Sequence, residues 1–330
     1  MRRQSCGPRR VVCIGGGSGM VSLLSGLRPY TEVRDGPGIE VTAIVTAIAP
    51  ARGTRMRRGF QPPADIRRYL TALASPQAPV MRALDFRFPA GTSLRGQVLG
   101  DLMFAAVSDL EGGLPKAVDA CRRLLRLRGK VVPSTTHPVT IERSMANGSL
   151  RVGETAQAEP REATVRQIRL LPRRPAANPD AIEALLNADL ITMGPGPLFA
   201  GLIGTLLVEG IASAVYRSAA PRILIGNLMS EPAQTTGYTL ADQVDAIRTH
   251  TGFPLIDLVL SNRAPVDAER LARYRRCGSA PVRTNPEVLR GMNIMQIEKD
   301  LLSDGPLIRH DLSALGGTIT ELFKKARKTA

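Results

Sequence analysis

The chain has 330 residues, of which 43% are hydrophobic but only 4% aromatic, which disfavours an aromatic stacking platform for single-stranded nucleic acid. The formal net charge is +15, yet 38 of the 44 basic residues are arginines dispersed along the chain, a skew that a GC-rich genome produces unaided. Composition therefore favours solvated basic faces first, a small anionic ligand second and nucleic acid third.

Residues 1–10 form a basic tail, and we expect one Rossmann-like domain over residues 11–330. Apolar runs of strand length recur along it, with helical patterns between them. The predicted strands are residues 11–14, 41–45, 131–132, 190–193, 223–225 and 258–260. The predicted helices are residues 65–74, 99–110, 116–127, 179–187, 203–216, 240–249 and 266–274. Continuous apolar strands that alternate with helices predict an α/β fold, an open and largely parallel sheet with helices on both faces.

A glycine-rich corner follows the first strand, before the apolar pattern resumes at Met20. Its residues are Gly15, Gly16, Gly17, Ser18 and Gly19. Glycine lets the chain turn sharply and lets a phosphate approach the N–H groups of a helix N-terminus, while Ser18 can cap the helix or donate its hydroxyl. The corner matches neither G-x-G-x-x-G nor G-x-x-x-x-G-K-[ST]. Alone, it indicates a plain strand-to-helix corner as readily as a phosphate site.

Two segments depart from the alternation of strands and helices. Residues 49–63 are rich in arginine, glycine and proline without periodicity, which predicts a mobile basic loop. Residues 138–172 alternate apolar and polar side chains, and Asn-Gly-Ser separates IERSMA from LRVGE as a hairpin turn would. We therefore expect a small antiparallel insertion around residues 138–172.

Residues 190–215 resemble a membrane span, but the prolines and glycines of their first half would leave backbone groups unpaired in lipid. A strand, a turn and a buried helix are predicted there instead. The apolar run of residues 11–14 is too short for a signal-peptide core. The four cysteines (Cys6, Cys13, Cys121 and Cys277) share no metal or disulfide spacing, and the three histidines are scattered. These features predict a cytoplasmic protein with no membrane span and no metal site.

Small polar residues follow three further predicted strands. They are Ser134 and Thr135, Gly194 and Gly196, and Asn227. Ligands of parallel sheets bind outside the carboxyl ends of the strands, where helix N-termini gather. Together with the glycine corner, these residues predict a nucleotide or nucleotide-sugar site on one rim of the sheet.

The motifs carry a family resemblance. In order, they are GGGSG, PPADIR, VVPSTTHPVT, GE, MGPGPLF, NLMSEPAQTTGYTLAD and RHDLSALGGTI, within residues 11–320. The succession resembles the superfamily that unites 2-phospho-L-lactate transferase with the bacterial gluconeogenesis factor, which binds UDP-sugars. The hairpin region and VVPST are more similar to the gluconeogenesis factor branch.

Several polar residues of that family are replaced here. The family's paired aspartates fall on Ala49 and Pro50, its GHSxGN reads GQVLGD, and the glutamate of its GET falls on Gln234. A metal that bridges a diphosphate needs carboxylates, so metal-dependent transfer is disfavoured. Asp65, Asp101 and Asp242 remain near family motifs, and we expect structural caps or helix-end residues rather than ligands.

Arginines take the place of the lost acids. Arg52, Arg55, Arg57 and Arg58 lie in the loop expected over the site, and arginine pairs with phosphate without a metal. We hypothesise that they contact the ligand's phosphates, against the alternative of a basic loop facing solvent. Asp65 and Arg67 of PPADIR are expected to support the site.

The resemblance implies a UDP-sugar-binding regulatory protein linked to cell shape and carbon metabolism. Backbone N–H groups of Gly16, Gly17 and Gly19 would bind the diphosphate, Ser134 and Thr135 phosphate or sugar hydroxyls, and Asn227 sugar or base. The alternative is a transferase like 2-phospho-L-lactate transferase, with a nucleotide-diphosphate-linked substrate and Mg²⁺. A nucleic-acid binder, a paralogue that has lost its ligand, and a homo-oligomer stay open.

Overall fold

The computed structural model describes residues 8–31, 38–46, 64–74, 79–153 and 164–326. Its main sheet has seven strands in the order β10-β9-β8-β7-β1-β2-β3, and every neighbouring pair is parallel. The strands are β1 (Arg9–Ile14), β2 (Ile39–Val45), β3 (Gly129–Pro133), β7 (Leu190–Met193), β8 (Arg222–Ile225), β9 (Leu258–Asn262) and β10 (Met295–Lys299). The predicted parallel α/β sheet is confirmed.

Helices cover both faces of this sheet because alternate residues of each central strand point to opposite sides. Val11 and Cys13 of β1 join one buried apolar cluster, while Val12 and Ile14 join the other. The first cluster is covered by α1 (Gly17–Leu27), α2 (Ala64–Leu73), α4 (Leu99–Glu111), α5 (Leu114–Leu124) and α12 (Leu312–Ala326). The second is covered by α6 (Pro179–Leu186), η2 (Leu198–Ile203), α7 (Gly204–Leu206), α8 (Ile211–Arg217) and α9 (Leu240–Thr251).

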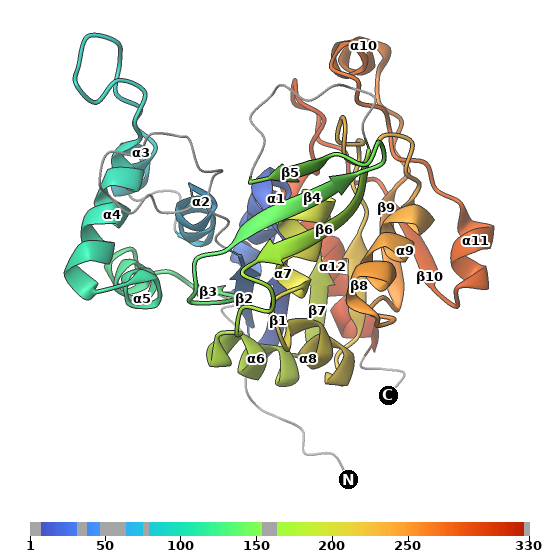
Figure 1. Cartoon of the computed structure of the whole chain (residues 1–330), viewed down its shortest axis with the longest axis horizontal. Helices are drawn as coiled ribbons and strands as arrows, with labels where there is room; N and C mark the ends of the chain where they lie inside the picture. The colour runs from blue at the N-terminus through green and yellow to red at the C-terminus, as the bar shows by residue number, and fades with distance from the viewer. Residues whose placement is uncertain (1–7, 32–37, 47–63, 75–78, 154–163, 327–330) are drawn as a thin grey trace.

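The remaining helices lie outside these two layers. With α3 (Pro79–Leu84), helices α2, α4 and α5 form a lobe beside β3, at the left of Figure 1. The others are the short η1 (Arg28–Thr31) after α1, and α10 (Ala268–Arg276) and α11 (Pro286–Gly291) between β9 and β10. No helix of the described residues is both long enough and apolar enough to cross a membrane.

The insertion is a second, antiparallel sheet in the order β5-β4-β6. Its strands are β4 (Thr140–Met145), β5 (Leu150–Val152) and β6 (Val165–Leu171). The predicted hairpin turn is confirmed, with the Met145 N–H donating to the Ser149 carbonyl over 2.9 Å. Ile141 of β4 and Ile168 of β6 face the same apolar cluster as α6 to α9. The small sheet therefore covers part of that face, and Figure 1 shows it in front of the parallel sheet.

One predicted helix is wrong in extent. Residues 203–216 were expected as a single helix, but α7 ends at Leu206 and α8 begins only at Ile211. Gly210 lies between them with φ +90°, a left-handed conformation that interrupts the helix. The sequence patterns also missed β10, α3, α11 and α12.

The strand order places a topological switch at the centre of the sheet. From β1 the chain proceeds outward to β2 and β3, and from β7 outward the other way to β8, β9 and β10. β1 and β7 are neighbours, with Ile14 beside Met193. Open α/β sheets bind ligands outside the carboxyl ends of the strands at such a point. The loops after β1 and β7 are therefore the first place to look for a site.

Candidate functional site

The loops after β1 and β7 pack against each other backbone to backbone. A Cβ on Gly16 would lie 2.6 Å from the Gly201 Cα, and a Cβ on Gly19 would lie 2.5 Å from the Pro195 carbonyl oxygen. Gly15, Gly16 and Gly194 are buried. These glycines are thus required for the crossing of the two loops. Only Gly17, Ser18 and Gly19, the first residues of α1, are partly or fully exposed at the corner.

The N-terminus of α1 is only partly satisfied by the protein. Gly16 is its N-cap and no side chain caps it. The Gly17 N–H donates to the Asp65 carboxylate of α2 over 3.3 Å. Asp65 therefore occupies one anion-binding direction of the helix end. The first-turn N–H groups after it belong to Ser18 and Gly19, whose residues line a cavity on the other side.

That cavity has a volume of about 310 Å³ and lies between the first turn of α1, the loops after β7 and β8, and the segment before α12. The polar and charged residues that matter most in its wall are Ser18, Gly196, Asn227, Glu231, Arg309 and His310. Four of the residues predicted from sequence, Ser18, Gly19, Gly196 and Asn227, are brought together here. Their role in ligand binding stays a prediction.

Asn227 fixes the loop after β7. Its Oδ1 accepts from the Gly196 N–H over 3.0 Å, and its Nδ2 donates to the Gly196 carbonyl over 2.9 Å. The side chain thus mimics a paired strand for a single glycine. This positions Gly196 in the cavity wall and leaves less of the Asn227 amide for a ligand.

Arg309 and His310 were missed as site residues, although RHD belonged to the motifs of the resemblance. Arg309 is exposed and forms no ion pair with any described residue that the structure records. His310 is 6% exposed, and its Nε2 has no hydrogen-bond partner. Burial lowers the pKa of His310 to about 4, although a hydrogen bond to the backbone of Gly226 opposes the shift. The ring is therefore neutral at physiological pH.

Helix α10 holds the segment that carries these two residues. The Tyr274 hydroxyl accepts from the Ile308 N–H over 3.1 Å. Arg270 Nη1 donates to the carbonyls of Ser303 and Gly305 over 2.7 and 3.1 Å. These bonds come from the helix to backbone groups of the segment. They fix the path of the chain immediately before the cavity wall.

Glu231 is the carboxylate of the cavity wall. Burial raises its pKa to about 7, although the Leu198 N–H at the start of η2 donates to it and opposes the shift. Its own N–H donates to the Thr235 hydroxyl over 2.8 Å. The carboxyl group is therefore held at a fixed place beside the β7 loop, and near neutral pH both protonation states are populated.

Ser134 and Thr135 lie away from this cavity. Ser134 follows β3, two strands from β1, and its hydroxyl is 2.6 Å from the Thr46 hydroxyl. The Thr135 hydroxyl accepts from the His137 N–H over 3.2 Å. Both residues are buried, at 0% and 2% exposure, and neither lines the cavity. They belong to the same rim of the sheet, but their hydroxyls are already used by neighbouring residues.

Gly15, Gly16 and Gly17 line a second and much smaller hollow, together with Thr46 and Asp65. Its volume is about 50 Å³, which is room for a water molecule or two rather than a nucleotide. Crossing of the loops after β1 and β7 therefore divides the predicted site residues between two sides. The 310 Å³ cavity is the side that can hold a ligand.

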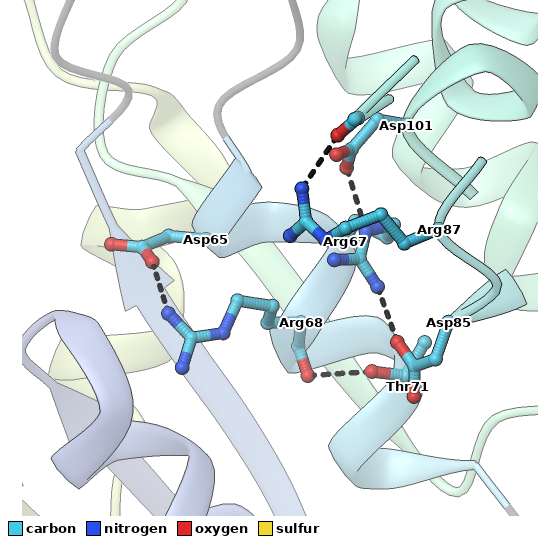
Figure 2. A network of polar contacts seen from close by, with 8 residues as sticks. Asp65, Arg67, Arg68, Thr71, Asp85, Arg87 and Asp101 are labelled. Carbon is cyan, nitrogen blue, oxygen red and sulfur yellow. Dashed lines mark hydrogen bonds and ion pairs between the residues drawn. The ribbon is translucent and has the colours of Figure 1, made fainter. Parts of the chain in front are cut away.

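Arg67 serves the lobe of α2 to α5, as Figure 2 shows. Its guanidinium donates to Asp101 of α4 and to Asp85 at the end of α3, both over 2.6 Å. Asp65 pairs instead with Arg68 over 3.3 Å. The sequence prediction for Asp101 as a helix-end residue agrees with its place in the first turn of α4.

Other predicted carboxylates and arginines fall into two groups. Asp242 forms a capping box with Thr239 at the start of α9, as expected of a structural cap. Ala49, Pro50, Arg52, Arg55, Arg57 and Arg58 lie outside the described residues. Within the ranges that the structure describes, no group of three or more histidine, cysteine, aspartate or glutamate side chains could hold a metal ion.

A further hollow of about 480 Å³ lies along the edge strand β3, between α5 and α6. Its charged residues are largely paired with one another, as Lys130 is with Glu40 over 2.9 Å and Arg122 with Asp119 over 2.9 Å. It includes the first residues of β1 and β2, at the opposite edge from the loops after β1 and β7. Its position and its mutually satisfied charges make it a weaker candidate.

Comparisons with known proteins agree with this architecture. A family model described as 2-phospho-L-lactate transferase CofD matches residues 11–302. The gluconeogenesis factor of Bacillus subtilis is 31% identical over 321 residues, which are 96% of this chain and 98% of that protein. A crystal structure of a UPF0052 family member from Bacillus halodurans has a TM-score of 0.83 and 26% identity, covering 95% of this chain and 99% of that one.

Some relatives are longer. A relative in Nostoc sp. is 40% identical over 286 residues, which are 85% of this chain and 60% of that protein. A relative in Deinococcus radiodurans is 36% identical over 275 residues, which are 82% of this chain and 57% of that protein. The chain thus spans less than two thirds of the length of these two relatives.

Proposed function

The chain belongs to the family of 2-phospho-L-lactate transferase CofD, and from that premise we propose that it is a cytoplasmic regulatory protein that binds a UDP-sugar. The observation that carries the proposal is the 310 Å³ cavity at the topological switch. Its volume lies at the lower end of the range usual for small-molecule sites. The gluconeogenesis factor of B. subtilis, similar along 96% of this chain, supports a link to carbon metabolism, and a link to cell shape is proposed with it.

The diphosphate is proposed to bind at the first turn of α1. Ser18 and Gly19 contribute N–H groups there, the helix dipole favours an anion, and Arg309 adds a full positive charge from the facing wall. An arginine can pair with two phosphate oxygens at once. The nucleoside and the sugar would then extend along Asn227, Leu228 and Glu231.

The arginine-rich segment is a second proposed source of phosphate contacts. Arg52, Arg55, Arg57 and Arg58 precede α2, whose Asp65 contacts the N-terminus of α1. A variant with all four arginines replaced by alanine tests this. We expect a smaller thermal shift with UDP-sugar than the wild-type chain gives, and an unchanged shift would remove these arginines from the proposal.

The binding proposal is tested by isothermal titration of the full chain with UDP-glucose and UDP-N-acetylglucosamine, and with GDP as the competing nucleotide. We expect saturable binding of a UDP-sugar that Arg309→Ala weakens at least tenfold. The matched control is Arg290→Ala, which removes an exposed arginine of α11. Equal affinities in the two variants would remove Arg309 from the site, and absence of binding would overturn the function.

The alternative function, a phospholactate-type transferase, is favoured by the description of the family model. Such an enzyme would hold a nucleotide-diphosphate-linked substrate with Mg²⁺, yet Glu231 is the single carboxylate among the residues that line the cavity. Incubation with the nucleotide-linked substrate and a deazaflavin acceptor, with and without Mg²⁺, separates the two functions. Formation of a transfer product that requires Mg²⁺ would favour the enzyme.

A further inference from the structure

Glu231 places a carboxylate in a cavity that otherwise suits an anion. The same cavity wall contains the first turn of α1 and the unpaired Arg309. A bound diphosphate and an ionised Glu231 would therefore share a volume of about 310 Å³. Two like charges that close together disfavour each other's ionised state. The inference below rests on the proposed function for its preferred ligand.

Its position is a particular feature of this chain. The family resemblance places a glutamate at the position of Gln234, and Gln234 does not line the cavity. Glu231 stands three residues earlier, in a turn closed by the Gln234 N–H donating to the Glu231 carbonyl over 3.1 Å. The Leu198 N–H donates to the carboxyl group from η2, so the side chain cannot simply swing out to solvent without losing that bond.

The groups that could compensate its charge are few. Among the residues that line the cavity, the other charged or titratable side chains are Arg309 and His310, both from the segment before α12. Arg309 favours the ionised carboxylate in the empty cavity, and an anionic ligand would engage that same arginine. His310 is neutral at neutral pH, because burial lowers its pKa to about 4. His310 thus cannot supply the missing positive charge.

We propose that Glu231 is a specificity-determining residue that takes up one proton when an anionic ligand enters the cavity, and then donates a hydrogen bond to that ligand. The proton comes from solvent and bonds to a carboxylate oxygen, and no other bond changes. A ligand with no negative charge draws no proton. The cavity thereby distinguishes a diphosphate from a neutral molecule of similar size by the state of one side chain.

Glu231 is suited to this exchange in the empty protein. Burial already raises its pKa to about 7, so protonation costs little near neutral pH. An anion nearby raises the pKa further. Binding should therefore be tighter at pH 6.5 than at pH 8.5, by a factor on the order of ten for a further shift of one to two pH units.

The test measures proton uptake directly. The full chain is titrated with UDP-glucose by calorimetry at pH 7.8, in two buffers with different ionisation enthalpies. The diphosphate of UDP-glucose is a diester, so it does not titrate between pH 6 and 8.5. We expect a net uptake of roughly half a proton per ligand in the wild-type chain and none in Glu231→Gln. The variant should also lose the tenfold dependence of affinity on pH.

The matched control is Glu287→Gln, the same chemical change on an exposed residue of α11. It should keep the wild-type proton uptake. Thermal unfolding of each variant checks that it is folded. Equal proton uptake in the wild-type chain and Glu231→Gln, or no pH dependence in the wild-type chain, would overturn the proposal.

Sulfate is a second probe that does not depend on the UDP-sugar assignment. It keeps both charges from pH 6 to 8.5, and its binding is followed as a thermal shift in the wild-type, Glu231→Gln and Arg309→Ala chains. We expect a larger shift at pH 6.5 than at pH 8.5, a pH-independent shift in Glu231→Gln, and a reduced shift in Arg309→Ala. If UDP-glucose fails to bind while sulfate behaves so, the proposed function fails and the role of Glu231 stands. If neither anion binds, both are overturned.

Discussion

Asn227 forms two hydrogen bonds with Gly196, one to its N–H over 3.0 Å and one from its amide to the Gly196 carbonyl over 2.9 Å. One side chain at the end of β8 therefore satisfies both backbone polar groups of a glycine in the loop after β7. Gly196 has φ +138°, a conformation that residues with a Cβ rarely adopt. The pair fixes the part of the cavity wall nearest to α1.

Asn227→Ala should destabilise the chain by about 1–3 kcal/mol, because the Gly196 N–H and carbonyl lose their partners in a partly buried place. Urea unfolding measures the change. The control Asn187→Ala, at the exposed C-terminal end of α6, should stay within about 0.5 kcal/mol of wild type. Similar losses in the two variants would show that the Gly196 pairing contributes little.

Gly196→Ala should be more damaging than another glycine substitution with similar backbone strain. A Cβ on Gly196 would collide with the Gly16 carbonyl oxygen, whereas a Cβ on Gly112 meets nothing within 4 Å, and both residues have positive φ. We expect about 3 kcal/mol or more for Gly196→Ala and about 1–2 kcal/mol for Gly112→Ala in urea unfolding. Equal costs would mean that the loops after β1 and β7 can separate easily.

His310 should make the protein less stable in mild acid. Its pKa is about 4 in the folded chain against 6.5 for a free histidine, so the unfolded chain binds more protons between these values. Stability therefore falls as pH falls from 6.5 to 4. His310→Gln should remove about 2 kcal/mol of the loss measured between pH 7 and 4.5 by urea unfolding. His137→Gln, at an exposed position, should leave the loss unchanged.

Cys13 and Cys121 should be inert to thiol reagents in the folded protein. Burial raises the pKa of Cys13 to about 12 and that of Cys121 to about 11, so neither forms a thiolate at pH 8. Cys277 is exposed. With Ellman's reagent, the variant lacking Cys6 and Cys277 should react only at the rate of unfolding. Rapid reaction of that variant would contradict the burial of the other two thiols.

Arg67 should couple more strongly to Asp101 than to Asp85. The Asp101 side chain is 28% exposed and that of Asp85 is 68% exposed, so solvent screens the second ion pair more. Double-mutant cycles with Arg67→Met, Asp101→Asn and Asp85→Asn give the coupling energies from urea unfolding. We expect about 1–2 kcal/mol for Asp101 and less than about 1 kcal/mol for Asp85. The reverse order would contradict the burial argument.

The fold was accessible from sequence because the central strands are buried on both faces. β1 and β7 are unbroken apolar runs, which polar edge strands are not. β10 reads MQIEK and has no fully buried residue, so its pattern gives no strand signal. Helix α12 was missed because Gly316 and Gly317 interrupt its pattern. Gly316 is there because α12 packs directly on the Gly26 backbone of α1.

The site was only partly accessible, for a reason of the same kind. The glycines of the corner were interpreted as room for a phosphate, but Gly16 makes room for Gly201 instead. A contact between residues so far apart in sequence cannot be inferred from local composition. Arg309 and His310 were quoted within a motif and still passed over, because no pattern around them predicted that their segment returns to α1.

The pairing of β1 with β7 also bears on how the protein is made. Arg10 of β1 donates to Asp189, which follows it by 179 residues, and the two halves of the sheet meet only at this seam. A nascent chain on the ribosome holds β1, β2 and β3 long before their central neighbour is synthesised. During that interval one side of β1 offers an unpaired apolar strand. We expect ribosome-bound chains that end before residue 190 to associate with chaperones, and longer chains to be released from them.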